Sequence, residues 1–398
     1  MTLKVLVASD LHAYTTRKPA PSFIEANVHD KPTSQHPLLA LAALIDERQL
    51  VADYLICPGD LCDRADVPAA QYAWTQLESL STKLKTRRFF GVTGNHDLDS
   101  RYLRPETQDP KEALRAMRPS YPVPDPVPGF QSLNQAYWLD HFAIMKEDGI
   151  RTLLLDTCAT HGMNPKEIDH GRITPSTLER LKQSLSNDSN EYSINLAICH
   201  HHPQQQAELE DDYDFMREGQ QFLELLGSGQ FGNWLVIHGH RHNPKLTYAA
   251  GGNTSPIVFS AGSLSVYLGP AQYGSMHNTF HIIDIEPGHD RSTLRGQVET
   301  YEFAFGHGWR PASADSSSMP FKTGFGFRGD LYELAEAASR EVDGTLPFTE
   351  LLGQVPMLKY LLPSDRTNLL ALLRKRFHVH SAYDDALEEL VFYRRAVV

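Results

Sequence analysis

Short, continuous apolar runs alternate with amphipathic segments along the first two-thirds of the chain. Between the runs, apolar residues recur at helical spacing, as in Leu38, Leu41, Leu44 and Ile45. The runs themselves have the length and composition of buried strands, and they cover Leu3–Ser9, Asp53–Gly59, Arg87–Gly94, Thr152–Thr157, Ile194–His200, Asn233–Gly239 and Pro256–Gly262. Strands that alternate with helices predict a layered α/β fold.

The last third of the chain follows a different pattern. Two more apolar segments, His277–Glu286 and Arg295–Phe305, are predicted as the final strands of the α/β domain. A stretch rich in Ser, Gly and Pro follows, and after Asp330 the apolar spacing is helical, with Ser364 and Ser381 as helix caps. We therefore predict an α/β domain over residues 1–309, a linker over 310–329 and a C-terminal extension of about four helices over 330–398.

Three long loops interrupt the first domain, over residues 13–37, 98–135 and 204–217. Long loops inside a compact domain are usually functional. The last of them contains an acidic cluster, which we interpret as a solvated surface: Glu208, Glu210, Asp211, Asp212 and Asp214.

The composition is that of an ordinary globular protein. Of the 398 residues, 41% are hydrophobic and 22% charged, which excludes wholesale disorder, a collagen-like fibre and a coiled coil. The 37 basic and 49 acidic residues give a net charge of −12, and an acidic chain is poorly suited to non-specific binding of duplex DNA. The four cysteines are predicted to be buried, reduced thiols, because no Cys-x-x-Cys spacing occurs among Cys57, Cys62, Cys158 and Cys199.

Targeting and membrane segments are not expected. No stretch reaches the roughly 18 consecutive apolar residues that a membrane helix requires. The apolar residues at the start of the sequence are too few for a secretory signal. We therefore expect a cytoplasmic protein with no membrane partner.

Five of the predicted strands end in Asp, Asn or His. Because the carboxyl ends of strands in an open α/β sheet line one crevice, these side chains are expected to converge. Mixed imidazole and carboxylate ligands suit divalent ions such as Mn, Fe or Zn. The five ends are Asp10-Leu11-His12, Gly59-Asp60, Gly94-Asn95-His96-Asp97, His200-His201-His202-Pro203 and His238-Gly239-His240-Arg241-His242.

Each of these motifs alone is common. A lone Asp-x-His is usually a capped turn, and Asp63, shortly after the second strand, is best explained as a helix cap. Five motifs in this order, each directly after an apolar run, nevertheless indicate a metal site.

The series resembles the calcineurin-like metallophosphoesterase superfamily, and within it the subgroup similar to cyclic-nucleotide phosphodiesterases. All five blocks are present in the family order over residues 5–242, whereas residues 310–398 lie outside the resemblance. The resemblance implies a four-layer α/β/β/α sandwich with two metal ions at one edge of the sheets.

The resemblance also implies a role for each site residue. Asp10, His12, Asp60 and His242 would hold one divalent ion, and Asp60, Asn95, His201 and His240 would hold the other, so that Asp60 bridges the two. His96 would contact the phosphoryl group and donate a proton, and Asp97 would orient His96. Two such ions, either Mn, Fe or Zn, could share a hydroxide that attacks phosphorus.

The function that the resemblance favours is a metal-dependent phosphodiesterase acting on small or nucleotide-type phosphoesters. A DNA or RNA nuclease of the same superfamily is less favoured, because such an enzyme needs a basic groove and no basic stripe is visible in the sequence. A phosphomonoesterase or nucleotide pyrophosphatase stays open, as does a homo-oligomer formed through the C-terminal helices. A non-catalytic scaffold is disfavoured because every expected ligand is present.

Several histidines near the motifs have no assigned role. Strand alternation is expected to point His200, His202 and His238 away from the site. His29 and His36 lie in the first long loop, where the sequence does not decide between contact with the site and exposure to solvent.

Overall fold

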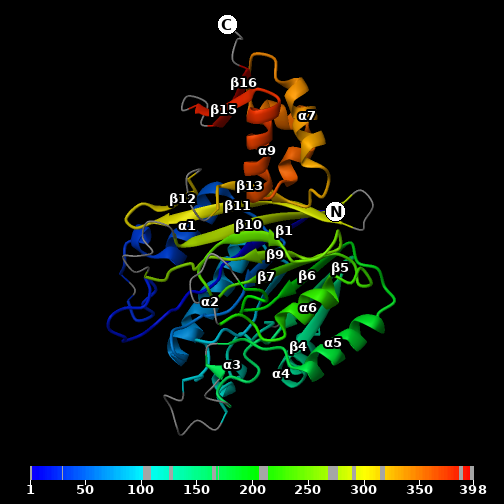
Figure 1. Cartoon of the computed structure of the whole chain (residues 1–398). Helices are drawn as coiled ribbons and strands as arrows, with labels where there is room; N and C mark the ends of the chain where they lie inside the picture. The colour runs from blue at the N-terminus through cyan, green and yellow to red at the C-terminus, as the bar shows by residue number, and fades with distance from the viewer. Residues whose placement is uncertain are drawn as a thin grey trace. The chain divides into compact units, whose positions relative to one another are not determined.

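The chain forms two compact units in the computed structural model (Figure 1). The first comprises Met1–Leu294 and Glu299–Phe321, and the second comprises Arg295–Val298 and Lys322–Val398. The structure describes residues 2–28, 30–101, 109–124, 129–163, 167–168, 170–205, 214–267, 277–288, 293–313, 319–384 and 389–394. His29 and four of the acidic-cluster residues, Glu208, Glu210, Asp211 and Asp212, lie outside these ranges.

The first sheet of unit 1 has the order β12-β11-β10-β1-β2-β3. Its strands β1, β2 and β3 run parallel, and β10 pairs antiparallel with β1. The bounds are β1 Leu3–Val7, β2 Tyr54–Cys57, β3 Arg88–Gly91, β10 Thr279–Pro287, β11 Leu294–Ala304 and β12 Gly308–Pro311.

The second sheet has the order β4-β5-β6-β7-β9-β8. Strands β5, β6, β7 and β9 are parallel, while β4 and β8 pair antiparallel at the two edges. The bounds are β4 Phe142–Glu147, β5 Ile150–Leu155, β6 Ile194–Ile198, β7 Trp234–His238, β8 Lys245–Tyr248 and β9 Ile257–Ser260. Each of the first seven predicted strand runs therefore overlaps a strand, and β4 and β8 were not predicted.

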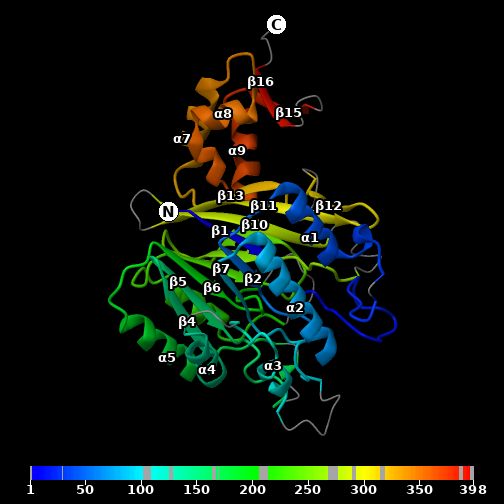
Figure 2. The ribbon, with the colours of Figure 1, turned by 180° about the vertical axis from the view of Figure 1, so that it is seen from behind.

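Helices cover the outer faces of both sheets (Figures 1 and 2). Helices α1 (Pro37–Arg48) and α2 (Val67–Leu84) share one apolar cluster with the first sheet, and α5 (Pro175–Ser186) and α6 (Gly219–Leu226) share another with the second. The remaining helices of this unit are the short α3 (Glu112–Arg115), α4 (Phe130–Asp140) beside β4, and the 3₁₀ turn η1 (Thr33–Gln35). The predicted α/β class, with two central sheets between helices, is confirmed.

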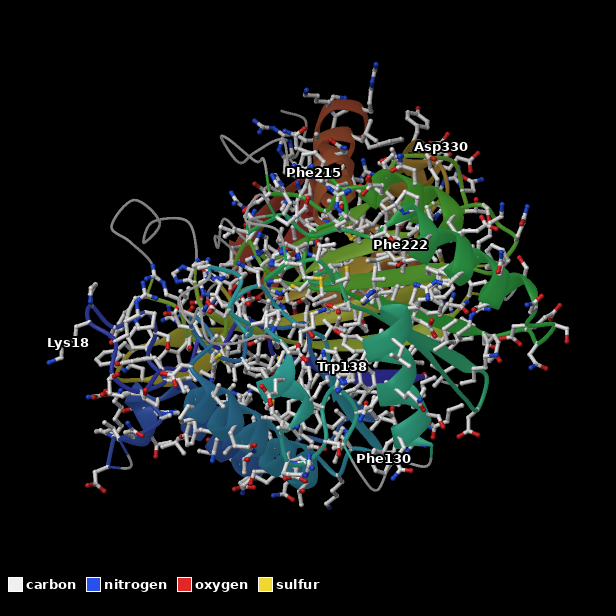
Figure 3. All side chains as sticks on the ribbon, turned by 90° about the horizontal axis from the view of Figure 1, so that it is seen from below. Lys18, Phe130, Trp138, Phe215, Phe222 and Asp330 are labelled. Atoms are coloured by element: carbon white, nitrogen blue, oxygen red, sulfur yellow. The ribbon has the colours of Figure 1, made fainter. Side chains whose placement is uncertain are left out.

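Local sequence signals explain where the helices begin. Thr174 caps α5, with Pro175 at the first helical position, as predicted. Asp66 caps α2 by accepting a hydrogen bond from the backbone N–H of Ala69, so the capping role expected of Asp63 belongs to Asp66 instead. Inside the layers, Phe222 of α6 is fully buried (Figure 3).

All four cysteines are free and buried, as the sequence predicted. Among the described residues, no helix combines the length and the apolar character needed to cross a membrane.

The second unit has its own apolar core. It contains α7 (Leu331–Glu341), α8 (Phe348–Gln354), the 3₁₀ turn η3 (Pro356–Tyr360) and α9 (Pro363–Arg376), with a small sheet of order β14-β16-β15. The strands are β14 Thr345–Pro347, β15 Val379–Asp384 and β16 Glu389–Arg394, and β13 (Lys322–Phe325) pairs with β11. Buried residues such as Leu334, Leu373 and Phe392 form the core.

The end of this unit corrects one sequence prediction. The segment after Ser381 was expected to be a helix, but β15 and β16 form an antiparallel hairpin in which Ser381 pairs with Phe392. The run Leu390-Val391-Phe392-Tyr393 is rich in aromatic and β-branched residues, which favour strands, and a short apolar run does not by itself distinguish a helix from a strand. The boundaries of the predicted linker stay predictions, although β12 and β13 occupy parts of residues 310–329.

We expect Leu373→Ala to weaken the second unit. Leu373 is 1% exposed and lies in its apolar core, and removing a buried leucine side chain costs about 2–5 kcal/mol. Amide hydrogen exchange of the full chain should show faster exchange in α7 and α9. The matched control is Lys375→Ala on the exposed side of α9, which should leave this exchange unchanged. Equal protection in Leu373→Ala and the unaltered chain would contradict the assigned core.

Candidate metal centre

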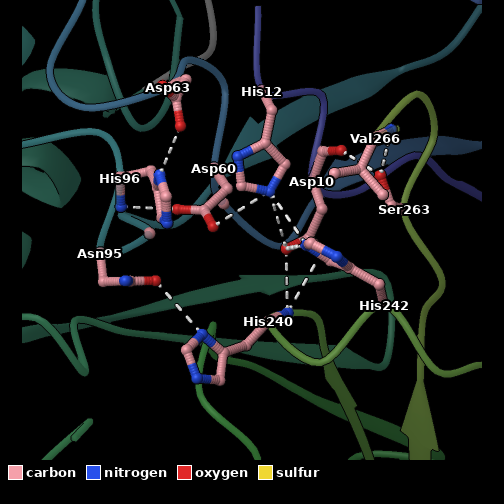
Figure 4. Close-up of polar contacts among 12 residues, drawn as sticks. Asp10, His12, Asp60, Asp63, Asn95, His96, His240, His242, Ser263 and Val266 are labelled. Carbon is pink, nitrogen blue, oxygen red and sulfur yellow. Dashed lines mark hydrogen bonds and ion pairs between the residues drawn. The ribbon is translucent and has the colours of Figure 1, made fainter. Parts of the chain in front are cut away.

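The loops that follow β1, β2, β3 and β7 bring polar side chains together at one place (Figure 4). The backbone there is unusual, because five non-glycine residues have positive φ angles: Asp10 (53°), His12 (46°), Asp60 (54°), His240 (80°) and His242 (55°). Such conformations are uncommon for residues with a side chain and are concentrated at functional sites. These backbone conformations cost free energy, and the packing of the surrounding fold maintains them.

A first group of candidate ligands consists of Asp10, His12, Asp60 and His242. The Nε2 atoms of His12 and His242 lie 2.9 Å apart. Asp10 Oδ1 lies 3.4 Å from His242 Nε2, and Asp60 Oδ2 lies 3.5 Å from His12 Nε2. Ligand atoms about 2.1 Å from one tetrahedral ion lie about 3.4 Å from each other, so these spacings fit a single cation.

Burial keeps His12 in the form that can bind a cation. Burial lowers the pKa of His12 to about 3, even though the neighbouring Asp60 carboxylate acts in the opposite direction. The neutral imidazole that results has one ring nitrogen with a free lone pair, which is the form that ligates metals.

A second group consists of Asp60, Asn95, His200 and His240. Asn95 Oδ1 lies 3.1 Å from His200 Nε2 and 3.2 Å from His240 Nδ1. Asp60 Oδ2 lies 3.4 Å from His200 Nε2. These four atoms again have the spacing of ligands around one cation.

The surroundings of His200 determine which of its nitrogens faces the group. Its Nδ1 lies 2.9 Å from the carbonyl oxygen of Pro58, which can only accept, so Nδ1 donates and the lone pair of the neutral ring lies on Nε2. Burial lowers the pKa of His200, but the Asp60 carboxylate outweighs burial and raises it to about 9. The Asp60 carboxylate therefore stabilises a positive charge at the position of His200.

The position of His200 corrects the expectation that strand alternation turns it away from the site. β6 ends at Ile198, so the chain at residue 200 is no longer extended and the alternation no longer applies. His201, the residue predicted as a ligand, places its Nδ1 2.9 Å from Thr157 Oγ1. Its Nε2 is buried with no hydrogen-bond partner within the described part of the chain, and its ring lies 4.5 Å from that of His240.

Asp60 belongs to both groups. Its Oδ2 faces His12 and His200, while its Oδ1 accepts a hydrogen bond of 2.8 Å from the backbone N–H of His96. Burial alone would favour the protonated carboxyl, yet the electrostatic interaction and hydrogen bond with His200 lead the contributions that outweigh it and hold the pKa of Asp60 well below its usual range. The carboxylate is thus ionised and stands between the two groups.

Glycines next to the ligands permit this close approach. A Cβ on Gly94 would overlap the carboxylate of Asp60, and a Cβ on Gly239 would overlap that of Asp10. The Gly-Asn-His and Gly-His motifs therefore need glycine because any side chain there would push the ligand loops apart.

His96 lies beside the first group but does not contact Asp97. Its Nδ1 lies 3.0 Å from Asp63 Oδ1, and Arg17 is hydrogen-bonded to the other oxygen of Asp63. Burial opposes ionisation of Asp63, but the hydrogen bonds from His96 and Arg17 outweigh it and lower the pKa of Asp63 to about 2. The expected orienting role of Asp97 thus falls to Asp63, which the sequence did not identify.

Asp97 instead fixes the loops after β2 and β3. Its carboxylate accepts hydrogen bonds from the backbone N–H groups of Gly94 (2.8 Å), Asp60 (2.9 Å) and Cys62 (3.2 Å). Burial raises the pKa of Asp97, and the Asp60 carboxylate raises it further. The contacts therefore indicate a structural role for Asp97 in positioning Asp60.

Other histidines of the region have separate surroundings. His36 caps α1 by accepting a hydrogen bond from the N–H of Leu39, and His238 is buried beside the backbone of Gly239. His240 Nε2 lies 3.1 Å from Asp214 Oδ2, and Asp214 also pairs with Arg241. Asp214 is the described member of the acidic cluster, and this residue contacts the site instead of only facing solvent.

The residues present fit metal ions. Both groups combine imidazole nitrogens with carboxylate or amide oxygens. Ligand-type atoms converge within 4.8 Å in Asp10–His12–His242 and in His200–His201–His240, and the latter set places His201 beside the second group. This mixture suits Mn, Fe or Zn, and a shared anionic carboxylate offsets the mutual repulsion of two cations.

Comparison with known proteins gives a consistent assignment. A family model described as calcineurin-like phosphoesterase matches residues 3–255, and a second model, wHTH-Calcineurin_assc, matches residues 323–375. The second match covers α7, α8 and nearly all of α9, and the hairpin of β15 and β16 follows it in the chain. No protein of curated function matches the chain in sequence.

Solved structures resemble the chain at low identity. A purple acid phosphatase from yellow lupin is 14% identical with a TM-score of 0.44, and the match covers 82% of this chain but only 54% of the lupin protein. GAP50 of Plasmodium, an anchor in the inner membrane complex, is 12% identical with a TM-score of 0.42, covering 90% and 95% of the two chains. The NAD nucleotidase of Haemophilus influenzae is 10% identical with a TM-score of 0.38, covering 95% and 67%.

We expect two divalent ions per chain, and we expect His200→Ala to lose one of them. His200 Nε2 lies among the atoms of the second group, whereas the nearest hydrogen-bonding partner of His201 is the Thr157 hydroxyl. Metal analysis after purification without chelator and supply of Mn²⁺ measures the stoichiometry. The matched variant His201→Ala should keep both ions. Loss of an ion from His201→Ala but not from His200→Ala would restore the sequence assignment.

Proposed function

Because the chain belongs to the calcineurin-like phosphoesterase family, we propose that it hydrolyses phosphoesters at the two ligand groups described above, with a phosphodiester as the preferred substrate. The observation that carries the proposal is the sharing of Asp60 between two sets of ligand atoms, each spaced to surround one divalent cation. Asp10, His12 and His242 complete one set, and Asn95, His200 and His240 complete the other, with His201 as the sequence-based alternative to His200.

The metal ions would supply Lewis-acid chemistry, because divalent ions polarise a phosphoryl group and lower the pKa of bound water. The chain supplies the geometry. Asp60 sets the separation of the two ligand sets, and Asn95 contributes a neutral ligand, which leaves the centre more positive for an anionic substrate. This local charge reconciles an acidic chain with a negatively charged substrate.

His96 is placed to move a proton. Its side chain is 21% exposed, compared with 4% for His12 and 0% for His200, so His96 is the residue of the three that a substrate can reach. Asp63 fixes Nδ1 as the nitrogen that donates to a carboxylate, which leaves Nε2 as the nitrogen that would exchange a proton with a leaving oxygen.

Sequence features favour a diester over the alternatives. The His-x-Pro motif after β6 and Gly-Asp-Leu-x-Asp after β2 resemble the phosphodiesterase subgroup more than the repair nucleases. A nucleic-acid substrate would require a basic groove, and the net charge of −12 offers little support for one.

A substrate panel tests the proposed function. With Mn²⁺ supplied, we expect hydrolysis of bis-(4-nitrophenyl) phosphate and of nucleotide diesters, with slower cleavage of 4-nitrophenyl phosphate and of single-stranded DNA. Phosphate and nitrophenolate release measure the rates. Preferential cleavage of the monoester or of DNA would overturn the diester assignment, and metal-loaded protein that is inactive on every ester would overturn hydrolysis itself.

We expect His96→Ala to separate metal binding from chemistry. His96 belongs to the proton-transfer side of the site, so both ions should stay bound, while kcat on a diester with a poor leaving group should fall by about 10²–10⁴-fold. The loss should be smaller with 4-nitrophenolate, which hardly needs a proton. Equal losses on poor and good leaving groups would instead indicate that His96 stabilises charge.

A further inference from the structure

Arg101 lies against the reactive nitrogen of His96. The residue follows His96 by five positions in the loop after β3, and its Nη2 lies 3.2 Å from His96 Nε2. Its other terminal nitrogen, Nη1, is buried and has no hydrogen-bond partner within the described residues. A buried guanidinium nitrogen without a partner is unfavourable, because its N–H groups have given up water without gaining an acceptor.

The contact fixes the state of His96 before substrate binds. A guanidinium has only donors and stays protonated in proteins, so His96 Nε2 must accept from Arg101. Since Nδ1 is turned toward the Asp63 carboxylate, the imidazole is neutral, with its proton on Nδ1. In this arrangement His96 has no proton on Nε2 to give to a leaving oxygen.

Arg101 has donors to spare beside His96. Arg17 is hydrogen-bonded to Asp63 and helps to keep that carboxylate ionised. Among the residues that the structure describes, no carboxylate pairs with Arg101, and Nη1 has no acceptor. An anion placed beside His96 would therefore give Arg101 the acceptors that it lacks, and arginine binds phosphate through paired hydrogen bonds.

We propose that Arg101 forms a second anion position beside His96 that binds a phosphate carried by the leaving group of the substrate. The preferred substrates are then phosphoesters or phosphoanhydrides whose leaving group has its own phosphate, such as nucleoside polyphosphates cleaved at the α-phosphorus. The inference rests on the proposed function. The anion position lies on the leaving-group side because Arg101 contacts Nε2 of His96, the nitrogen that would face the leaving oxygen.

Binding at this position would also change what lies against His96. An anion would draw the guanidinium toward itself and away from Nε2, so that this nitrogen could face the leaving oxygen. In the reaction, water oxygen bonds to the α-phosphorus, the bond between that phosphorus and the leaving oxygen breaks, and the leaving oxygen keeps the electron pair. The attacking water releases a proton to solvent, so atoms and charge balance.

The test compares two substrates that differ only in the leaving group. Thymidine 5′-(4-nitrophenyl phosphate) releases 4-nitrophenolate, and thymidine 5′-triphosphate releases pyrophosphate on cleavage at the same α-phosphorus. Arg101→Gln should lower kcat/KM for the triphosphate by about 10- to 100-fold more than for the aryl ester, which is the range expected for lost hydrogen bonds to a charged group. Arg101→Lys should restore part of the difference, because it keeps the charge without the paired donors.

A binding measurement separates this inference from the proposed function. Calorimetric titration of metal-loaded protein with inorganic pyrophosphate should show a dissociation constant about 10- to 100-fold higher in Arg101→Gln, at unchanged metal content, with a smaller change for orthophosphate. The matched control is Arg115→Gln in α3, whose guanidinium pairs with Asp109 and should leave both affinities unchanged.

The outcomes are distinct. An unchanged ratio of kcat/KM between the two substrates, together with unchanged pyrophosphate affinity, would overturn the role of Arg101 while leaving hydrolysis intact. Wild-type protein that carries two ions and cleaves neither substrate would overturn the proposed function, and the pyrophosphate titration would still decide whether the anion position exists.

Discussion

The ionised Asp60 carboxylate is the interaction on which the rest of the site depends. The residue is 1% exposed, and a charge so deeply buried is stable only with hydrogen bonds and opposite charge around it. One oxygen is satisfied by the backbone of His96, while the other faces His12 and His200 from two different groups. Burial lowers the pKa of His12, so that ring stays neutral, whereas the Asp60 carboxylate raises the pKa of His200. Positive charge near Asp60, from His200 or from a bound cation, thus stabilises the buried carboxylate.

The fold positions the Asp60 carboxylate by fixing the backbone of the loops around it, in addition to fixing side chains. Asp97 gathers backbone N–H groups from the loops after β2 and β3, including that of Asp60 itself. Gly94 allows those loops to approach until the Asp60 carboxylate occupies the space of a side chain. This approach requires positive φ angles at Asp60 and Asp10, which are unfavourable for the backbone. The packing of the two buried sheets outside the site offsets that free-energy cost.

The sequence was informative wherever one physical signal dominated, and less so where contacts depend on the exact path of a loop. Continuous apolar runs predicted the buried strands, but β4 and β8 at the sheet edges are partly exposed and lack that signal. Alternation mispredicted His200 because the chain turns after Ile198. The sequence pointed to Asp97 as the partner of His96 and to Asp63 as a helix cap, and only the fold shows that Asp63 faces the ring. A helix was expected where β16 lies, because leucine spacing outweighed the strand preference of Val391 and Phe392.

The two ligand groups are not equivalent, and the difference follows from what lies behind each imidazole. In the second group, the ring nitrogens outside the ligand set are held in place, His240 Nε2 by Asp214 and His200 Nδ1 by the Pro58 carbonyl. Partners of this kind orient a histidine and raise its basicity as a ligand. In the first group, His242 is 23% exposed, and the ring of His12 contacts those of both His96 and His242. His242 is therefore more exposed than His200 and His240 of the second group, whose side chains are 0% and 8% exposed.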